Sequence, residues 1–326
     1  MGRPDTVMQC YLSDKGRFAD LFNGVFFRGE QFIRSRDLQD SSERYSETAG
    51  QGTSRFRDIK MTLKDNRTLR ILAVENQANI DYTMPYRCLQ YDVMEYGKQL
   101  RERKNANRAG NLLTTSPERL CGITKTDKIA PVYTLCLYHG EEPWDGPLSL
   151  RDMMDFGNGG DRMEQYFADY PLRLFCINES DSFDMFHTEL RELFSAMRYR
   201  RDKERLQKLF ACDAHYSRLS PDTVRALSVL LNIPDLWRRR EQYRDKTGSE
   251  EYNMCQAWEE IKEECYAKGI TQGITQGIAQ GITQGIEKGS RDKVRTIVQN
   301  MLKHGFSKEE ICELTECSAE FISGLQ

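Results

Sequence analysis

The sequence lacks the patterns that mark several common classes of protein. Its 326 residues contain no run of roughly 20 apolar residues, so we expect no membrane-spanning helix. The first residues show no apolar signal core, and the ten cysteines form no C-x-x-C pair. We therefore expect a cytoplasmic protein with reduced thiols, not a disulfide framework.

Two kinds of chemistry also lack their usual residues. The four histidines are far apart and form no H-x₃-H or Cys/His cluster, which argues against a zinc site. No G-x-x-x-x-G-K-[ST] segment is present, so hydrolysis of nucleoside triphosphates is not expected. The net charge is −3, so any binding of nucleic acid must use local basic segments.

The pattern of apolar residues predicts an α/β domain followed by helices. The expected helices are at 17–33, 83–103 and from near Ser149, with residues 183–265 helical and strongly charged. The expected strands are a β-hairpin at 55–63 and 68–77, and further strands at 128–140 and 171–179. The chain then divides into a domain at 1–200, a helical region at 201–268, a repeat at 269–289 and a small helical tail at 290–326.

An apolar strand that ends in an acid is the most informative feature of the hairpin. The residues ILAV run directly into Glu75, and a buried carboxylate is costly unless something compensates it. If the turn centres on Asn66 and Arg67, antiparallel pairing places Asp58 opposite Glu75, with the two carboxylates roughly 5 Å apart. A slip of one residue would move Asp58 to the other face.

A divalent cation would remove the repulsion between these two acids. Mg²⁺ prefers a few carboxylates together with water and phosphate oxygens. Gln77 points to the same face as Glu75 and could orient a water molecule. The alternative is an exposed hairpin face that carries ordinary surface acids.

The same residues resemble the core of the PD-(D/E)XK nuclease superfamily. Asp58 is followed about 17 residues later by Glu75-Asn76-Gln77, and then by a helix. More closely, the chain resembles the Rpn family of recombination-promoting nucleases, also described as transposase-like. The matching segments are RFADLFNGVFF, MPYRCLQYDVMEY and APVYTLCLYHG, followed by WDGP and LSLRDM. They cover most of 14–200, and the glycine repeat resembles the tail of that family.

The resemblance implies a metal-dependent DNA endonuclease linked to recombination or mobile elements. Its fold would be a restriction-endonuclease-like mixed sheet flanked by helices, followed by an α-helical carboxyl-terminal region. Asp58 and Glu75 would bind Mg²⁺ or Mn²⁺, with the main-chain carbonyl of Asn76 as a third ligand. Gln77 stands where the superfamily usually has Lys, and an amide can only hydrogen-bond. The alternative is therefore a nuclease-fold module that binds DNA or another partner with little or no catalysis.

Four further features are candidates for supporting roles. Arg87 and Tyr91 lie four residues apart on the expected helix, where the arginine could clamp the scissile phosphate or simply pack along the tyrosine. In the first helix Asp20 is the preferred additional acid, although Asp14 and Glu30 compete with it. The segment RERKNANR at 101–108 is the best candidate for contacts with the DNA backbone.

Residues 269–289 repeat a four-residue unit, GITQ-GITQ-GIAQ-GITQ-GIEK-G. Six glycines in a helix would cost about 0.8–1 kcal/mol each relative to alanine. A period of four advances by about 40° per repeat on a helix, so the isoleucines wind around the axis. The repeat predicts either a packed helix that forms a homo-oligomer contact or a flexible linker. Beyond it, Ser307 and Glu310 predict a capping box.

Overall fold

The chain forms two compact units, residues 1–258 and 259–326. The computed structural model describes residues 4–41, 44–45, 55–56, 58–65, 68–157, 162–245 and 250–325. The division between the units falls in the first turns of helix α9 (Met254–Lys303), and each unit is described by itself.

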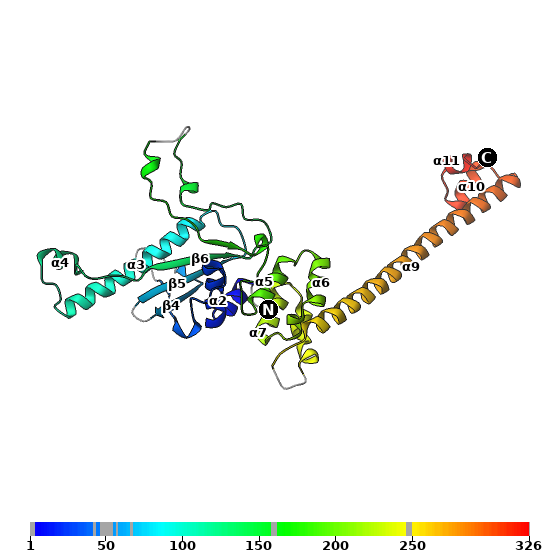
Figure 1. Cartoon of the computed structure of the whole chain (residues 1–326). Coiled ribbons are helices and arrows are strands. Elements are labelled where there is room, and N and C mark those ends of the chain that lie inside the picture. The colour runs from blue at the N-terminus through cyan, green and yellow to red at the C-terminus, as the bar shows by residue number, and fades with distance from the viewer. Residues whose placement is uncertain are drawn as a thin grey trace. The chain divides into compact units, whose positions relative to one another are not determined.

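The first unit combines a sheet with short helices (Figure 1). Its strands are β1 (Leu38–Asp40), β2 (Arg44–Tyr45), β3 (Arg55–Phe56), β4 (Ile59–Asp65), β5 (Thr68–Gln77), β6 (Val132–Tyr138) and β7 (Leu174–Cys176). Its helices before α9 are α1 (Pro4–Leu12), α2 (Lys15–Phe27), α3 (Met84–Ala109), α4 (Ser116–Cys121), α5 (Leu190–Arg198), α6 (Lys203–Cys212), α7 (Pro221–Leu230) and α8 (Pro234–Arg238).

The main sheet is mixed and has the strand order β1-β4-β5-β6-β7. The pairs β1–β4 and β4–β5 are antiparallel, whereas β5–β6 and β6–β7 are parallel. Helix α3 forms the crossover from β5 to β6, as parallel neighbours require. The expectation of an α/β protein with a helical carboxyl-terminal region is confirmed at this level.

The hairpin has the register that the sequence predicts. Ile59 pairs with Val74, and the ladder runs without a slip to the pair of Asp65 and Thr68. The turn expected at 66–67 lies outside the described residues. Asp58 directly precedes β4, so continuing the ladder by one residue sets it across from Glu75.

Helices cover both faces of the sheet. On one face, Ile71 and Val132 pack with Tyr96 of α3, and Cys136 packs with Met84 and Cys88 at the start of that helix. On the other face, a small cavity is lined by Leu63 and Leu72 of the sheet and by Phe22, Phe26 and Phe27 of α2. Helix α1 is tied to α7 by a hydrogen bond of 2.8 Å between the hydroxyls of Tyr11 and Thr223.

Three local expectations were wrong or incomplete. No helix begins near Ser149, because the N–H groups of Leu148 and Ser149 both donate to the Asp152 carboxylate and Ser149 bridges to Pro171. Only a single 3₁₀ turn follows, at Arg151–Met153. The segment 183–265 contains five separate α-helices, counting the start of α9, joined by turns. Helix α1 and strand β1 were not anticipated.

The second unit consists of most of α9 followed by α10 (Lys308–Thr315) and α11 (Ala319–Ser323). The glycine repeat is helical throughout, although no described part of the chain packs against it, so the oligomer contact expected for it stays a prediction. Val298, Ile311 and Ile322 form the small core where these three helices meet. The capping box of Ser307 and Glu310 is present as expected. None of the described helices is both long and apolar enough to cross a membrane.

A buried ion pair joins the sheet to α3. Lys60 of β4 and Glu95 of α3 lie 3.0 Å apart, and their side chains are only 2% and 4% exposed. A charge buried at this depth is tolerated when its partner is in place, and removing one partner leaves the other uncompensated. This pair therefore locks β4 against α3 close to Asp58.

We expect Lys60→Met to lower the free energy of unfolding by about 3–5 kcal/mol, because Glu95 would stay buried without its cation. The control is Lys98→Met, which breaks the more exposed Lys98–Glu102 pair on the same helix (side chains 26% and 65% exposed) and should cost less than about 1 kcal/mol. Urea unfolding followed by tryptophan fluorescence measures both, since Trp144, Trp237 and Trp258 all lie in the first unit. Equal losses for the two variants would contradict a structural role of the buried pair.

Candidate functional site

The segment Glu75-Asn76-Gln77 ends β5 between an antiparallel neighbour, β4, and a parallel neighbour, β6. In open α/β sheets, ligands bind beyond the carboxyl ends of the parallel strands. Glu75 is buried, with 1% of its surface exposed, and Gln77 is half-buried. The carbonyl of Gln77 accepts a hydrogen bond of 2.9 Å from the N–H of His139, which fixes the ends of β5 and β6 together.

Asp58 lies in the bend before β4 and is held against β5. Its Oδ2 accepts a hydrogen bond of 2.7 Å from the backbone N–H of Asn76. Burial raises the pKa of Asp58, and the Asn76 N–H together with the charge of Arg87 offsets only part of that rise. Asp5 and His139 also act electrostatically on Asp58. This carboxylate is therefore short of compensating positive charge in the metal-free protein.

Arg87 on α3 connects the site to the loop after β5. Its Nη2 lies 4.0 Å from Glu75 Oε2, and its Nη1 lies 2.5 Å from Asp81 Oδ2. Burial alone would lower the pKa of Arg87, but hydrogen bonds with Asp81 and Tyr91 raise it. Burial alone would raise the pKa of Asp81, but hydrogen bonds from Thr83 and Arg87 lower it. Arg87 is thus a firmly charged cation beside Glu75.

The donor set at this strand end suits a hard cation. Two carboxylates, from Asp58 and Glu75, and the main-chain carbonyl of Asn76 are oxygen ligands of the kind that Mg²⁺ takes. Burial is the main cause of the raised pKa of Asp58, and a cation bound to its carboxylate would lower that pKa. These residues therefore fit a Mg²⁺ or Mn²⁺ ion, in competition with Arg87 for the Glu75 carboxylate.

Asp20 is not brought to this group. Its carboxylate on α2 accepts hydrogen bonds from the N–H groups of His187 and Thr188, at 2.9 and 2.7 Å, and from the Thr188 hydroxyl at 2.7 Å. With 2% of its surface exposed, it serves to fix the segment that leads into α5. The competing acid Asp14 caps α2 through the N–H of Arg17, and Glu30 is exposed just after that helix.

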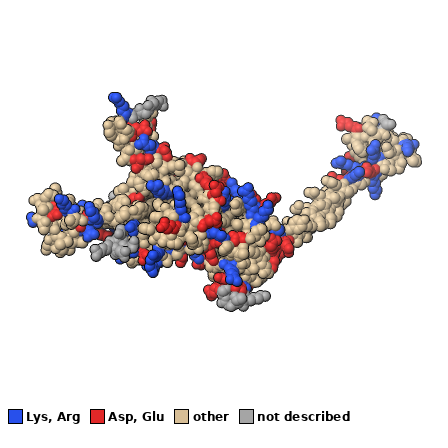
Figure 2. Space-filling model, viewed as in Figure 1, with Lys and Arg blue, Asp and Glu red and all other residues tan. Residues whose placement is uncertain are grey.

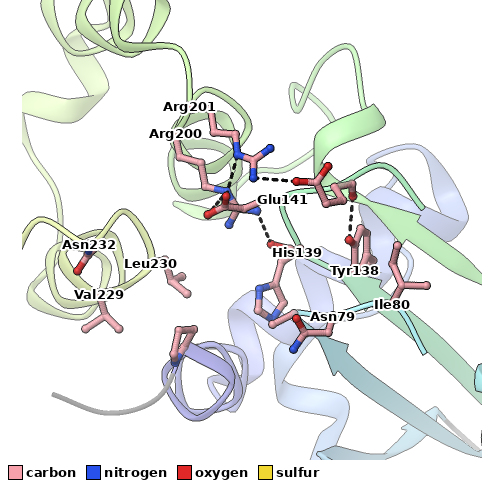
Figure 3. Close-up of a pocket in the computed structure, with 14 residues that line it drawn as sticks. Asn79, Ile80, Tyr138, His139, Glu141, Arg200, Arg201, Val229, Leu230 and Asn232 are labelled. Atoms are coloured by element: carbon pink, nitrogen blue, oxygen red, sulfur yellow. Dashed lines mark hydrogen bonds and ion pairs between the residues drawn. The ribbon is translucent and has the colours of Figure 1, made fainter. Parts of the chain in front are cut away.

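A cavity of about 630 Å³ opens beyond the ends of β5 and β6 (Figure 3). Its lining includes Asn79 and Ile80 after β5, His139 after β6, Arg200 after α5, and Asn232 after α7. Figure 3 shows the two arginines of this lining turned toward the loop after β6, where Arg201 pairs with Glu141 and Glu142 at 2.7 and 2.8 Å. The cavity therefore carries little net charge despite its four ionised groups.

Two buried polar side chains lie at the ends of β5 and β6, and their burial was not evident from the sequence. His139 is 3% exposed, and its Nε2 lies 3.5 Å from Asp5 Oδ1 of α1. Asn76 is 4% exposed, and neither atom of its amide group makes a hydrogen bond with the described part of the chain. Buried polar atoms without partners are uncommon and are costly to the folded state. Asn76 is thus a second place, beside Asp58, where this strand end is incompletely compensated.

A separate acidic cluster contains Glu192, Asp213 and His215, whose ligand-type atoms lie within 4.8 Å of one another. The Arg191 guanidinium already binds all three, with hydrogen bonds of 2.8 Å to each. A metal ion here would have to displace that cation. The cluster is explained as an ion-pair network at the start of α5.

We expect Asp58→Asn to stabilise the metal-free protein at pH 7 by about 0.5–2 kcal/mol. The substitution removes a buried charge, and the asparagine oxygen can still accept the hydrogen bond from the Asn76 N–H. The pKa of Asp58 is higher in the folded protein than in the unfolded chain. At a pH above the folded-state pKa, ionisation of Asp58 therefore lowers the free energy of unfolding, and at a pH below the unfolded-state pKa it has no effect. The gain should therefore shrink as the pH falls toward 4. Urea unfolding in EDTA at several pH values measures it, and a loss of stability at pH 7 would contradict the assignment.

Comparisons of the chain with protein-family models, with curated proteins and with solved structures found no match.

Proposed function

We propose that the protein is a metal-dependent DNA endonuclease of the PD-(D/E)XK type, with its reaction centre at Asp58 and Glu75. The observation that carries the proposal is the hairpin register, which sets Asp58 across from Glu75 at the carboxyl end of β5. The raised pKa of Asp58, which burial causes, also supports it, because a bound cation would offset the cost of that buried charge. The sequence resemblance to recombination-promoting nucleases suggests a link to recombination or mobile elements.

Each residue of the group has a role in this proposal. Asp58, Glu75 and the Asn76 carbonyl would hold Mg²⁺ or Mn²⁺, which when bound would lower the pKa of an attacking water. The Gln77 amide would hydrogen-bond that water and orient it, but it cannot take the proton. Hydrogen bonds with Asp81 and Tyr91 fix the Arg87 guanidinium, which would bind a phosphate oxygen from that position.

DNA is the proposed substrate because the last part of α3 is basic: residues 101–108 contain three Arg, one Lys and one Glu, a net charge of +3. The basic segment 101–108 begins 14 residues after Arg87 on the same helix, which is about 21 Å along its axis. That distance corresponds to roughly six base pairs of duplex. Arg101 and Arg103 are exposed, so contacts with backbone phosphates would be open to them.

A second function is favoured by one specific observation. Arg87 lies near Glu75, so its positive charge offsets part of the negative charge of that carboxylate without a metal. Gln77 stands where the superfamily usually has lysine, so no side chain at that position could act as a base. A nuclease-fold module that binds DNA or another partner, with weak or no cleavage, would have the same features. Cleavage assays separate the two functions.

We expect the purified protein to nick supercoiled plasmid in the presence of Mg²⁺ or Mn²⁺ and to lose the activity in EDTA. Asp58→Ala and Glu75→Ala should each lower the cleavage rate at least 100-fold, because both would remove a metal ligand. Glu313→Ala removes an exposed acid from α10, outside the proposed reaction centre and the basic segment, and is the control, with no expected effect. Agarose gels of plasmid forms, sampled over time, provide the measurement.

Binding of a labelled duplex, measured by fluorescence anisotropy, completes this experiment. Loss of cleavage with unchanged binding in Asp58→Ala is the expected result. Cleavage that survives both substitutions would remove these residues from the reaction centre. Binding without any cleavage in either metal would favour the non-catalytic module.

A further inference from the structure

Helix α9 presents a long surface without charge. Residues 269–286, which are 18 residues long, contain no Lys, Arg, Asp or Glu. Figure 2 shows this stretch as an unbroken tan segment of the helix. All of residues 262–293 are exposed, so no other described part of the chain covers them.

The repeat sorts this surface into four rows that run along the helix. Because identical residues recur every four positions, glycine, isoleucine, threonine and glutamine each form one row, and the glycine row lies between the glutamine and isoleucine rows. The isoleucines are 46–65% exposed, and they are Ile270, Ile274, Ile278, Ile282 and Ile286. Each repeat therefore places an apolar ridge directly beside a groove.

No contact within the described chain explains the glycines. A Cβ atom added at any of the six glycines from 269 to 289 would meet nothing within 4 Å. Alanine would fit at each position and would favour the helix more strongly. Glycine is useful in a helix where another backbone must approach closely.

The threonine row, in contrast, needs no partner. The hydroxyls of Thr271, Thr275 and Thr283 donate to the carbonyls four residues earlier, at 2.8–3.0 Å. Their polar groups are satisfied by the helix itself, and Ala279 replaces threonine in the third repeat. The rows that no contact within the helix explains are therefore the glycine and isoleucine rows, which wind side by side around it.

We propose that residues 269–286 form the contact of a homodimer in which the α9 helices of two copies cross. The isoleucine ridge of each copy would enter the glycine groove of the other, since ridges along i±4 rows pack into the matching grooves. Ridge and groove are neighbours on one helix, so the surface is self-complementary, as a two-fold contact requires. A repeat longer than 3.6 residues makes the crossing right-handed.

Charge on the two flanks selects an antiparallel arrangement. Residues 259–268 contain four Glu and two Lys, a net charge of −2, and residues 287–296 contain two Lys, two Arg, one Glu and one Asp, a net charge of +2. These flanks lie at equal distances from the centre of the uncharged stretch. An antiparallel pair brings opposite signs together, whereas a parallel pair would place like charges side by side.

The small size of the surface indicates a weak, transient dimer. A stretch of 18 residues is about 27 Å long and offers roughly 400 Å² per copy, or about 800 Å² in total. This is about half of a standard protein interface, so a dissociation constant of about 10–100 µM is expected. Association should therefore be visible only as the protein concentration rises.

Sedimentation velocity of the full chain over about 1–300 µM tests the proposal. The wild type should change from monomer to dimer with rising concentration. Gly277→Leu/Gly281→Leu fills the groove with good helix formers, so it should weaken association at least tenfold while circular dichroism shows no loss of helix. The matched control is Thr275→Ala/Thr283→Ala on the other side of the helix, with a dissociation constant within twofold of wild type.

Charge reversal tests the orientation. Glu263→Lys/Glu264→Lys changes the first flank from −2 to +2, so it should weaken an antiparallel dimer several-fold at low salt and less at high salt. A parallel dimer would be unaffected, because both of its paired flanks would still be alike. An unchanged dissociation constant in this variant would overturn the antiparallel arrangement.

Two outcomes would overturn the contact itself. One is a wild-type chain that stays monomeric over the whole concentration range. The other is a leucine variant that dimerises as tightly as the wild type, which would place the contact elsewhere. Neither outcome depends on nuclease activity, so the two proposals fail separately.

Discussion

The burial of carboxylates between the sheet and α3 is the constraint on which the first unit depends. Glu75, Asp92 and Glu95 are all less than 7% exposed on this side of the sheet. Lys60 compensates Glu95, hydroxyl groups of Thr134 and Tyr170 bind Asp92, and Arg87 lies near Glu75. Near the carboxyl end of β5, burial raises the pKa of Asp58. A perturbed acid of this kind makes the strand end a candidate functional site.

The sequence predicted the hairpin well because two independent signals agreed. Turn-forming residues between the strands and the alternation of apolar residues both specify one register, so Asp58 came opposite Glu75. The capping box of Ser307 and Glu310 was predictable because its chemistry is local. The class of the domain followed from alternating helices and strands.

The features that could not be predicted from the sequence depend on contacts between residues that are distant in the chain. Lys60 looks like an ordinary strand lysine until Glu95, 35 residues later, is seen 3.0 Å away. Asp20 looked like an active-site acid, but its partners at 187 and 188 are more than 160 residues away in sequence. The helix expected near Ser149 failed because the Asp152 carboxylate binds the backbone N–H groups of an extended segment. In each case a polar side chain has a tertiary partner that no local pattern reveals.

Glu75 in the first unit and the six repeat glycines in the second unit are both residues that are costly to the folded chain where they lie. Glu75 is costly in its strand unless a cation lies near it, and the six glycines are costly in α9 unless another backbone approaches them. Arg87 lies near the first, and no contact in the described residues explains the second. In the two proposals, a bound ion and a second copy would offset these costs. A residue that lowers stability without an evident compensating contact is stronger evidence for a binding partner than an exposed side chain is. Exposed side chains are normal on a protein surface, whereas a destabilising residue requires an explanation.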